Sequence, residues 1–120
     1  MTTCGTDIIE IDRIKDSIEK YGQKFLETIY TKNEIEYCES KKMQKYQHYA
    51  VRFAAKDAIY KAVSNNIEIP GTWTDFEILN EKTGRPKVNL KIKIEGLKNI
   101  DISLSHCKQY AIANVVVEWE

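Results

Sequence analysis

The chain has 120 residues, of which 42% are hydrophobic, and its 18 basic side chains balance 18 acidic ones to give a formal net charge of zero. This length suits one domain with one modest core and is too short for two, so we expect a single domain over residues 1–120. The neutral total argues against a protein dedicated to nucleic acid, since such proteins usually carry a basic excess.

The N-terminal part predicts a strand followed by an amphipathic helix. Residues 4–9 form a short, partly β-branched segment, so we expect a strand that carries Asp7 near its end. From Ile11 the apolar positions recur at helical spacing, which predicts a helix with one apolar stripe. The basic side chains of this helix should face water: Arg13, Lys15 and Lys20.

Two further helices are predicted before the middle of the chain. Thr31 and Glu34 have the spacing of a capping box, so a helix should begin there and run to about residue 39. The longest helix is expected over residues 42–65, where apolar side chains recur at threes and fours. Asp57 continues that apolar series, which places a carboxylate at the edge of the buried face. His48 fits no motif and is expected on the helix surface.

The second half of the chain has the pattern of strands. Asn65-Asn66 and Pro70-Gly71 are helix-stop and turn signals. Beyond them apolar and polar side chains alternate, which is typical of half-exposed strands in an antiparallel sheet. The predicted fold class is therefore α+β, with helices packed on one face of a small antiparallel sheet. The expected strands cover residues 76–78, 88–94, 100–104 and 111–119, with a loop at residues 83–86.

Asp7 and Asp57 are the candidates for metal binding. They lie on separate elements, and magnesium commonly takes one or two protein carboxylates and completes its shell with water and substrate phosphates. The plainer interpretation makes Asp7 a helix cap and Asp57 the i,i+4 ion-pair partner of Lys61. The residues alone leave both interpretations open.

Basic residues gather around Asp57 although the whole chain is neutral. Residues 41–61 contain six basic side chains and one acid, which suits a polyanionic ligand or an acidic protein. Lys56 and Lys61 are point charges suited to phosphate oxygens, and Arg52 is placed to grip a terminal phosphate through two hydrogen bonds. A solvated helix face is the alternative for each of these side chains.

Three segments together resemble one enzyme family. Residues 5–11 (GTDIIEI), 52–62 (RFAAKDAIYKA) and 103–106 (SLSH) occur in the order and at about the spacing of the holo-acyl-carrier-protein synthases, the small bacterial 4′-phosphopantetheinyl transferases. The resemblance covers residues 5–118. One position departs from the pattern, because Asp57 stands where the family usually has Glu.

The resemblance implies an activity and a site. The implied reaction transfers 4′-phosphopantetheine from coenzyme A to a serine of an apo acyl carrier protein, in support of fatty acid biosynthesis, and releases adenosine 3′,5′-bisphosphate. Asp7 and Asp57 would hold Mg²⁺, with Mn²⁺ as the alternative ion, and Lys61 would stabilise the leaving phosphate. Either Asp57 or a metal-bound water would take the serine proton. The residues implied to contact coenzyme A are Arg52, Lys56, Lys61, Gly84, Arg85, Pro86, Ser105 and His106.

The resemblance also implies partners and an assembly. Family members of this length are trimers with sites at subunit interfaces, so we expect a homotrimer. The acidic carrier protein would dock on the first helical region, through Arg13, Lys15, Lys20 and Lys24.

Cysteine spacing and hydropathy bear on the compartment. The three cysteines lack the paired spacing of a zinc site or a disulfide framework, which favours free thiols. No signal peptide and no stretch of membrane-spanning length is evident. We therefore expect a cytoplasmic protein with neither a membrane nor a nucleic-acid partner.

Two other classes stay open. A non-catalytic module that binds coenzyme A or a carrier protein would result if aspartate at position 57 has disabled turnover. A ferredoxin-like interaction domain is the second alternative, and it would leave the three motifs unexplained.

Overall fold

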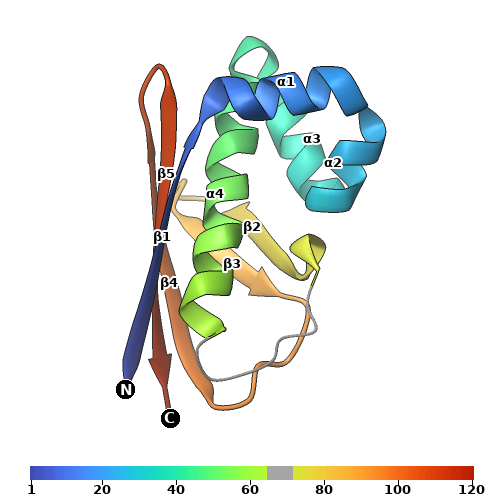
Figure 1. Cartoon of the computed structure of the whole chain (residues 1–120). Coiled ribbons are helices and arrows are strands. Elements are labelled where there is room, and N and C mark those ends of the chain that lie inside the picture. Colours follow the sequence, from blue (N-terminus) through green and yellow to red (C-terminus); the bar gives the residue numbers. More distant parts are fainter. Residues whose placement is uncertain (65–71) are drawn as a thin grey trace.

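The computed structural model describes residues 1–64 and 72–120, and its largest sheet has three strands (Figure 1). Strand β5 (Tyr110–Trp119) lies in the middle and pairs antiparallel with β1 (Thr2–Glu10) and with β4 (Leu97–His106). Strands β2 (Phe76–Asn80) and β3 (Pro86–Leu90) form a separate antiparallel pair. The predicted α+β class is confirmed, although the strands form two sheets instead of one.

Four α-helices are present in the described residues: α1 (Ile11–Tyr21), α2 (Gln23–Ile29), α3 (Lys32–Ser40) and α4 (Lys45–Val63). Short 3₁₀ turns precede α4 and β2, at Lys42–Gln44 and Trp73–Asp75. Helix α4 runs along one face of the three-stranded sheet, and α1 to α3 lie together near the N-terminal end of α4 (Figure 1).

The starts of α3 and α4 have clear local causes. Thr31 and Glu34 form the predicted capping box, in which the Glu34 amide donates to Thr31 Oγ1 and the Thr31 amide donates to Glu34 Oε1. Helix α4 begins three residues later than predicted, because Lys42 has a φ of 55° and left-handed backbone cannot continue a helix.

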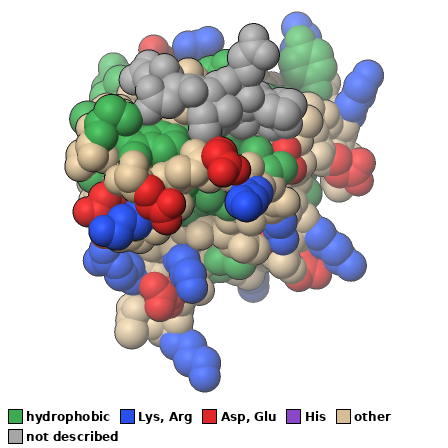
Figure 2. Space-filling view, turned by 90° about the horizontal axis from the view of Figure 1, so that it is seen from below, with side chains coloured by type: hydrophobic (Ala, Val, Ile, Leu, Met, Phe, Trp, Pro, Cys, Tyr) green, Lys and Arg blue, Asp and Glu red, His purple; other side chains and the backbone are tan. Residues whose placement is uncertain are grey.

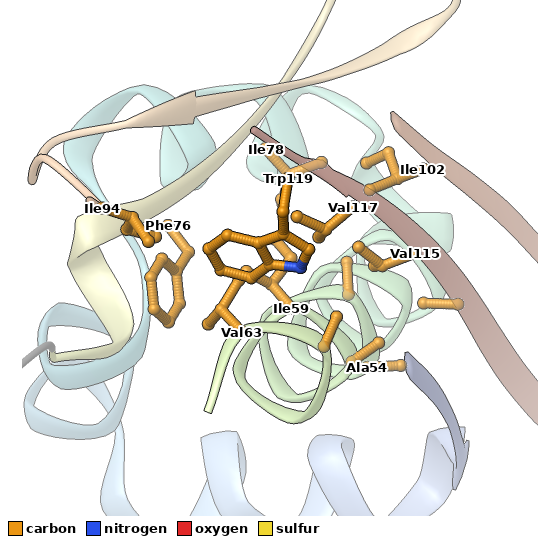
Figure 3. Close-up of a cluster of buried hydrophobic side chains, with 14 residues drawn as sticks. Ala54, Ile59, Val63, Phe76, Ile78, Ile94, Ile102, Val115, Val117 and Trp119 are labelled. Atoms are coloured by element: carbon orange, nitrogen blue, oxygen red, sulfur yellow. The ribbon is translucent and has the colours of Figure 1, made fainter. Parts of the chain in front are cut away.

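The core lies between α4 and the sheets (Figure 3). Every second residue of β5 is buried, which confirms the predicted alternation of the last strand. The facing side of α4 carries the small side chains of Ala54, Ala58 and Ala62, so helix and sheet approach closely. Trp119 closes the cluster against Phe76 and Val63, as Figure 3 shows.

One predicted strand is too long and one predicted turn is not described. The alternation over residues 88–94 continues past Leu90, but β3 ends there because Leu90 pairs with Phe76, the first residue of β2. Ile94 is buried all the same, through packing against the core. The turn signals at residues 65–66 and 70–71 lie outside the described residues.

The end of the molecule that holds both termini is mixed in charge, and one face of the large sheet carries exposed apolar side chains. Figure 2 views the end that holds both chain termini and shows acidic and basic side chains interspersed. On the sheet face turned away from α4, the side chains of Ile8, Tyr110, Ile112 and Val116 are exposed. No helix in the described part of the chain is both long and apolar enough to span a bilayer.

Candidate active site

Asp7, Asp57 and Lys61 meet where β1 crosses α4. The ammonium nitrogen of Lys61 lies 3.3 Å from Asp7 Oδ1 and 3.4 Å from Asp57 Oδ2. It also donates to the carbonyl oxygen of Thr6 at 3.2 Å. The side chain of Asp57 is therefore long enough to contact the same Lys61 ammonium group as Asp7, even though it is one methylene shorter than glutamate.

A glycine and a threonine bring β1 this close to α4. A Cβ atom on Gly5 would lie 2.1 Å from the carbonyl oxygen of Ala58, so only glycine fits at this crossing. Thr3 Oγ1 donates to the carbonyl oxygen of Ala62 at 2.6 Å, one turn further along the helix. These contacts set the position of Asp7 opposite Asp57.

The carboxylates of Asp7 and Asp57 repel each other. Burial, and next the charge of Asp57, raise the pKa of Asp7, while Lys61 opposes the rise. The hydrogen bond to Asp7 is the main cause of a raised pKa for Lys61. In the described residues no group of three or more His, Cys, Asp or Glu side chains could hold a metal ion. Asp7 and Asp57 offer two hard carboxylate donors, and magnesium commonly takes one or two protein carboxylates.

A cavity of about 280 Å³ opens beside the two aspartates, and we call it the carboxylate cavity. Its wall is partly apolar, and Arg13 of the predicted docking set contributes to it. Lys15 and Lys20 are exposed on α1, whereas Lys24 lies on α2, beyond the break at Gly22. The lining residues include Asp7, Arg13, Ile14, Phe25, Phe53 and Asp57.

A second cavity of about 270 Å³, which we call the histidine cavity, lies between α4, β4 and the loop after β2. It brings together several residues implied to contact coenzyme A: Arg52, Gly84, Arg85, Pro86 and His106. Three residues that no motif indicated also line it: Tyr37, His48 and Asn80. No described residue lines both the histidine cavity and the carboxylate cavity.

Arg52 is a buried cation in the histidine cavity. Its side chain is 2% exposed and lies over the ring of Tyr37, with the guanidinium carbon 4.3 Å from the ring centroid. It donates to Asn80 Oδ1 at 2.6 Å and to the carbonyl oxygen of His48 at 3.4 Å. Its Nε is buried and has no hydrogen-bond partner. A buried donor without a partner is costly, so this atom marks a place for an acceptor.

His48 is half-buried in the cavity wall, which corrects its expected place on the surface. Its ring centroid lies 6.3 Å from that of His106. Burial, and next the charges of Arg52 and Lys41, lower the pKa of His48 to about 4. His48 is therefore neutral at pH 7. The one hint in the sequence was its position four residues before Arg52, on the same helix face.

Lys56 does not reach the surface, so the prediction that it binds a phosphate is wrong. The side chain is fully buried and ion-paired to Glu34 at 2.8 Å. Its other protons go to the carbonyl oxygens of Trp73 and Phe76, at 3.0 and 2.6 Å. Glu34 also accepts from the amide of Ile78 at 2.8 Å. With all three N–H donors satisfied, Lys56 joins α4 to α3 and β2.

Ser105 and Arg85, which were also predicted to contact coenzyme A, differ from the other predicted contacts in their surroundings. Ser105 lies on the exposed face of β4, opposite to the side on which His106 enters the histidine cavity. Arg85 lines that cavity, but its guanidinium makes two hydrogen bonds to Asp101, at 2.9 and 3.0 Å. In a single chain, Ser105 is therefore separated from the other predicted contacts.

Comparison with known proteins identifies relatives over nearly the whole length. The 4′-phosphopantetheinyl transferase superfamily matches at residues 3–115. A holo-[acyl-carrier-protein] synthase from Ruminiclostridium cellulolyticum is 50% identical over 119 residues, which cover 94% of this chain and 89% of the relative. One from Chloroherpeton thalassium is 45% identical over 95% of each chain.

Solved structures with the same fold include two that contain the coenzyme. The holo-(acyl-carrier-protein) synthase of Bacillus anthracis, in complex with CoA (3′,5′-ADP), superposes with a TM-score of 0.81 at 34% identity over 98% of this chain and 96% of that one. The Helicobacter pylori enzyme in complex with coenzyme A gives a TM-score of 0.83 at 30% identity over 96% and 99%.

Proposed function

The chain belongs to the 4′-phosphopantetheinyl transferase superfamily, and from this premise we propose that it is a holo-[acyl-carrier-protein] synthase. It transfers 4′-phosphopantetheine from coenzyme A to a serine of an apo acyl carrier protein and thereby serves fatty acid biosynthesis. The observation that carries this proposal is the convergence of Asp7, Asp57 and Lys61 at the edge of an open cavity.

The donor set of the site fits a divalent cation. Two carboxylates share a partly buried position. Burial, and next repulsion from Asp57, raise the pKa of Asp7, and a bound cation would offset both effects. Asp7 and Asp57 would hold Mg²⁺, with Mn²⁺ as the alternative. When bound, the ion neutralises charge on the pyrophosphate oxygens of the coenzyme.

The chain's own residues offer an acceptor for the proton and stabilise part of the developing charge. The serine hydroxyl oxygen forms a bond to the β-phosphorus of coenzyme A, and its proton passes to the carboxylate of Asp57 or to a water molecule beside it. The bond from that phosphorus to the bridging oxygen breaks, and the electron pair leaves with adenosine 3′,5′-bisphosphate. Lys61, half-exposed beside both aspartates, stabilises the negative charge on the leaving phosphate.

The histidine cavity is the proposed site for the nucleotide end of the coenzyme. It offers the unpartnered Nε of Arg52, the neutral ring of His48 and the side chain of His106. Its lining is distinct from that of the carboxylate cavity, which supports a site completed by the histidine cavity of another subunit. The exposed apolar face of the large sheet supports the homotrimer that this requires.

The remaining parts of the proposal concern the partner and the compartment. The acidic carrier protein docks beside the carboxylate cavity, on Arg13, Lys15, Lys20 and Lys24. Cys4, Cys38 and Cys107 are free thiols, which supports a location in the reducing cytoplasm.

Mass spectrometry of an apo carrier protein tests the proposal most directly. After incubation with coenzyme A and Mg²⁺, the carrier protein should gain one phosphopantetheine group, and Asp7→Ala should abolish the gain while the fold stays nearly intact. Binding of coenzyme A without any transfer would favour the non-catalytic module instead. A wild-type rate in Asp7→Ala would remove Asp7 from the site.

A further inference from the structure

Asn80 links the two parts of the histidine cavity that carry its arginines. It is the last residue of β2, and its half-buried side chain makes one hydrogen bond in each direction. Oδ1 accepts from Arg52 at 2.6 Å, and Nδ2 donates to the carbonyl oxygen of Gly84 at 2.9 Å. One amide therefore joins α4 to the loop that contains Arg85.

Arg52 depends on this contact for its orientation. Its bond to Asn80 is much shorter than its bond to the His48 carbonyl oxygen, 2.6 against 3.4 Å. The Tyr37 ring supports the guanidinium plane from one side. With NH2 held by Asn80, the unpartnered Nε keeps a defined direction in the cavity wall.

The loop depends on Asn80 in a similar way. Asn80 pairs with Pro86 as the last rung of the β2–β3 ladder, and the residues between them form a tight turn. Gly84 adopts a φ of 90°, which favours glycine, and its amide donates to the carbonyl oxygen of Glu81 at 2.8 Å. The hydrogen bond from Asn80 to the Gly84 carbonyl oxygen closes this turn and fixes the backbone position at which Arg85 follows.

We propose that Asn80 is a positioning residue for coenzyme A: it orients Arg52 and the Gly84-Arg85-Pro86 loop toward one phosphate group at the nucleotide end. The inference rests on the proposed function. It assigns Asn80 no contact with the reacting atoms, which lie at Asp7, Asp57 and Lys61. Loss of Asn80 should therefore weaken binding of the nucleotide end and leave the chemical step unchanged at saturating coenzyme A.

Calorimetry with two nucleotides on the intact protein tests this. For Asn80→Ala, the Kd for adenosine 3′,5′-bisphosphate should rise about tenfold, the effect expected from losing a hydrogen bond to a charged group. The Kd for adenosine 5′-monophosphate, which lacks the 3′-phosphate, should change little. In the transfer assay, KM for coenzyme A should rise while kcat stays the same.

Asn89→Ala is the matched control. Asn89 lies on β3 and donates to Glu77 at 3.1 Å, so its loss also removes a side-chain hydrogen bond, but it does not line the histidine cavity. Its nucleotide affinity should match that of the wild type. If Asn80→Ala fails to fold, Asn80→Asp keeps the shape and the acceptor for Arg52, but it loses the donor to Gly84 and adds a charge that repels phosphate. It should weaken bisphosphate binding at least as much.

The outcomes separate this inference from the proposed function. Unchanged bisphosphate affinity in a folded Asn80 variant, or an equal loss for both nucleotides, overturns the positioning role and leaves the transferase proposal standing. A wild-type protein that binds neither bisphosphate nor coenzyme A overturns the proposed function and this inference with it.

Discussion

Asp57 is the side chain at which this chain departs from its family's usual glutamate, and it still contacts the ammonium that Asp7 contacts. Asp57→Asn should reduce transfer by at least about 100-fold, because even outer-shell partners of a metal contribute about 10–100-fold. Asp57→Glu should retain activity and shift the preference toward Mg²⁺ and away from the larger Mn²⁺, since the longer side chain suits the smaller ion.

A titration of the transfer rate with both ions across the three proteins measures this. Full activity in Asp57→Asn would leave Asp57 as merely the helix neighbour of Lys61. Glu10 would then be the next candidate for the metal.

His48 should make the fold sensitive to acid. Its pKa in the folded protein is about 4, below the ordinary value of 6.5, so protons bind more tightly to the unfolded chain. Above pH 6.5 His48 is neutral in both states and the free energy of unfolding has its full value. As the pH falls from 6.5 toward about 4, the unfolded chain takes up the proton first, so the free energy of unfolding decreases. His48→Gln should flatten this part of the stability curve. Urea unfolding of both proteins at several pH values in this window measures it, and parallel curves would contradict the assignment.

Two residues of the histidine cavity could not be predicted from the sequence, because they come together only in the folded chain. His48 and Asn80 are single polar residues on separate elements, and only the folded chain brings them to one cavity. Lys56 shows the reverse problem. A lysine next to Asp57 in the sequence suits a phosphate on charge alone, but its partner in the structure is Glu34, 22 residues away.

The contact between β1 and α4 is the element-level feature on which the site depends. Gly5→Ala should destabilise the fold by about 3 kcal/mol or more, because the added methyl group meets the helix backbone and overpacking alone costs about 1–3 kcal/mol. Cys4→Ala, at the neighbouring exposed position, is the control and should change little. Urea denaturation compares them. A Gly5→Ala protein with wild-type stability would mean that strand and helix separate without cost.

Most elements were predictable because their causes are local. The capping box of α3 and the alternation of β5 follow from neighbours in the sequence. The over-long β3 prediction failed because alternation reports which side chains are buried and says nothing about where a partner strand begins. The division into two sheets is likewise a property of pairing, which periodicity does not contain.

At the scale of the whole molecule, the exposed sheet face should be the trimer contact. Light scattering should give the mass of three chains, and Ile112→Lys should shift it toward the monomer because a charge then enters a buried apolar interface. Met43→Lys, which changes an exposed apolar residue on the 3₁₀ turn before α4 and outside the sheet, is the control. A monomer mass for the wild type at micromolar concentration would contradict the assembly, and a dimer would require a different interface.

The docking surface gives a second prediction at this scale. Lys20→Glu combined with Lys24→Glu should weaken carrier-protein binding about tenfold at low salt and leave coenzyme A affinity unchanged, because reversed rim charges act on encounter with an acidic partner. Lys82→Glu with Lys98→Glu reverses the same charge on exposed positions elsewhere. Parallel changes in both affinities would show that the surface is wrongly assigned.

The buried Lys56 also has a mechanical consequence. Its ammonium is held by three acceptors from outside α4, the carboxylate of Glu34 and the carbonyl oxygens of Trp73 and Phe76. Any rolling of α4 about its axis would break these bonds and leave a charge without partners in the core. The helix that carries Arg52, Asp57 and Lys61 is thus locked against rotation, so ligands must be accommodated by side-chain rotamers and not by a turn of the helix.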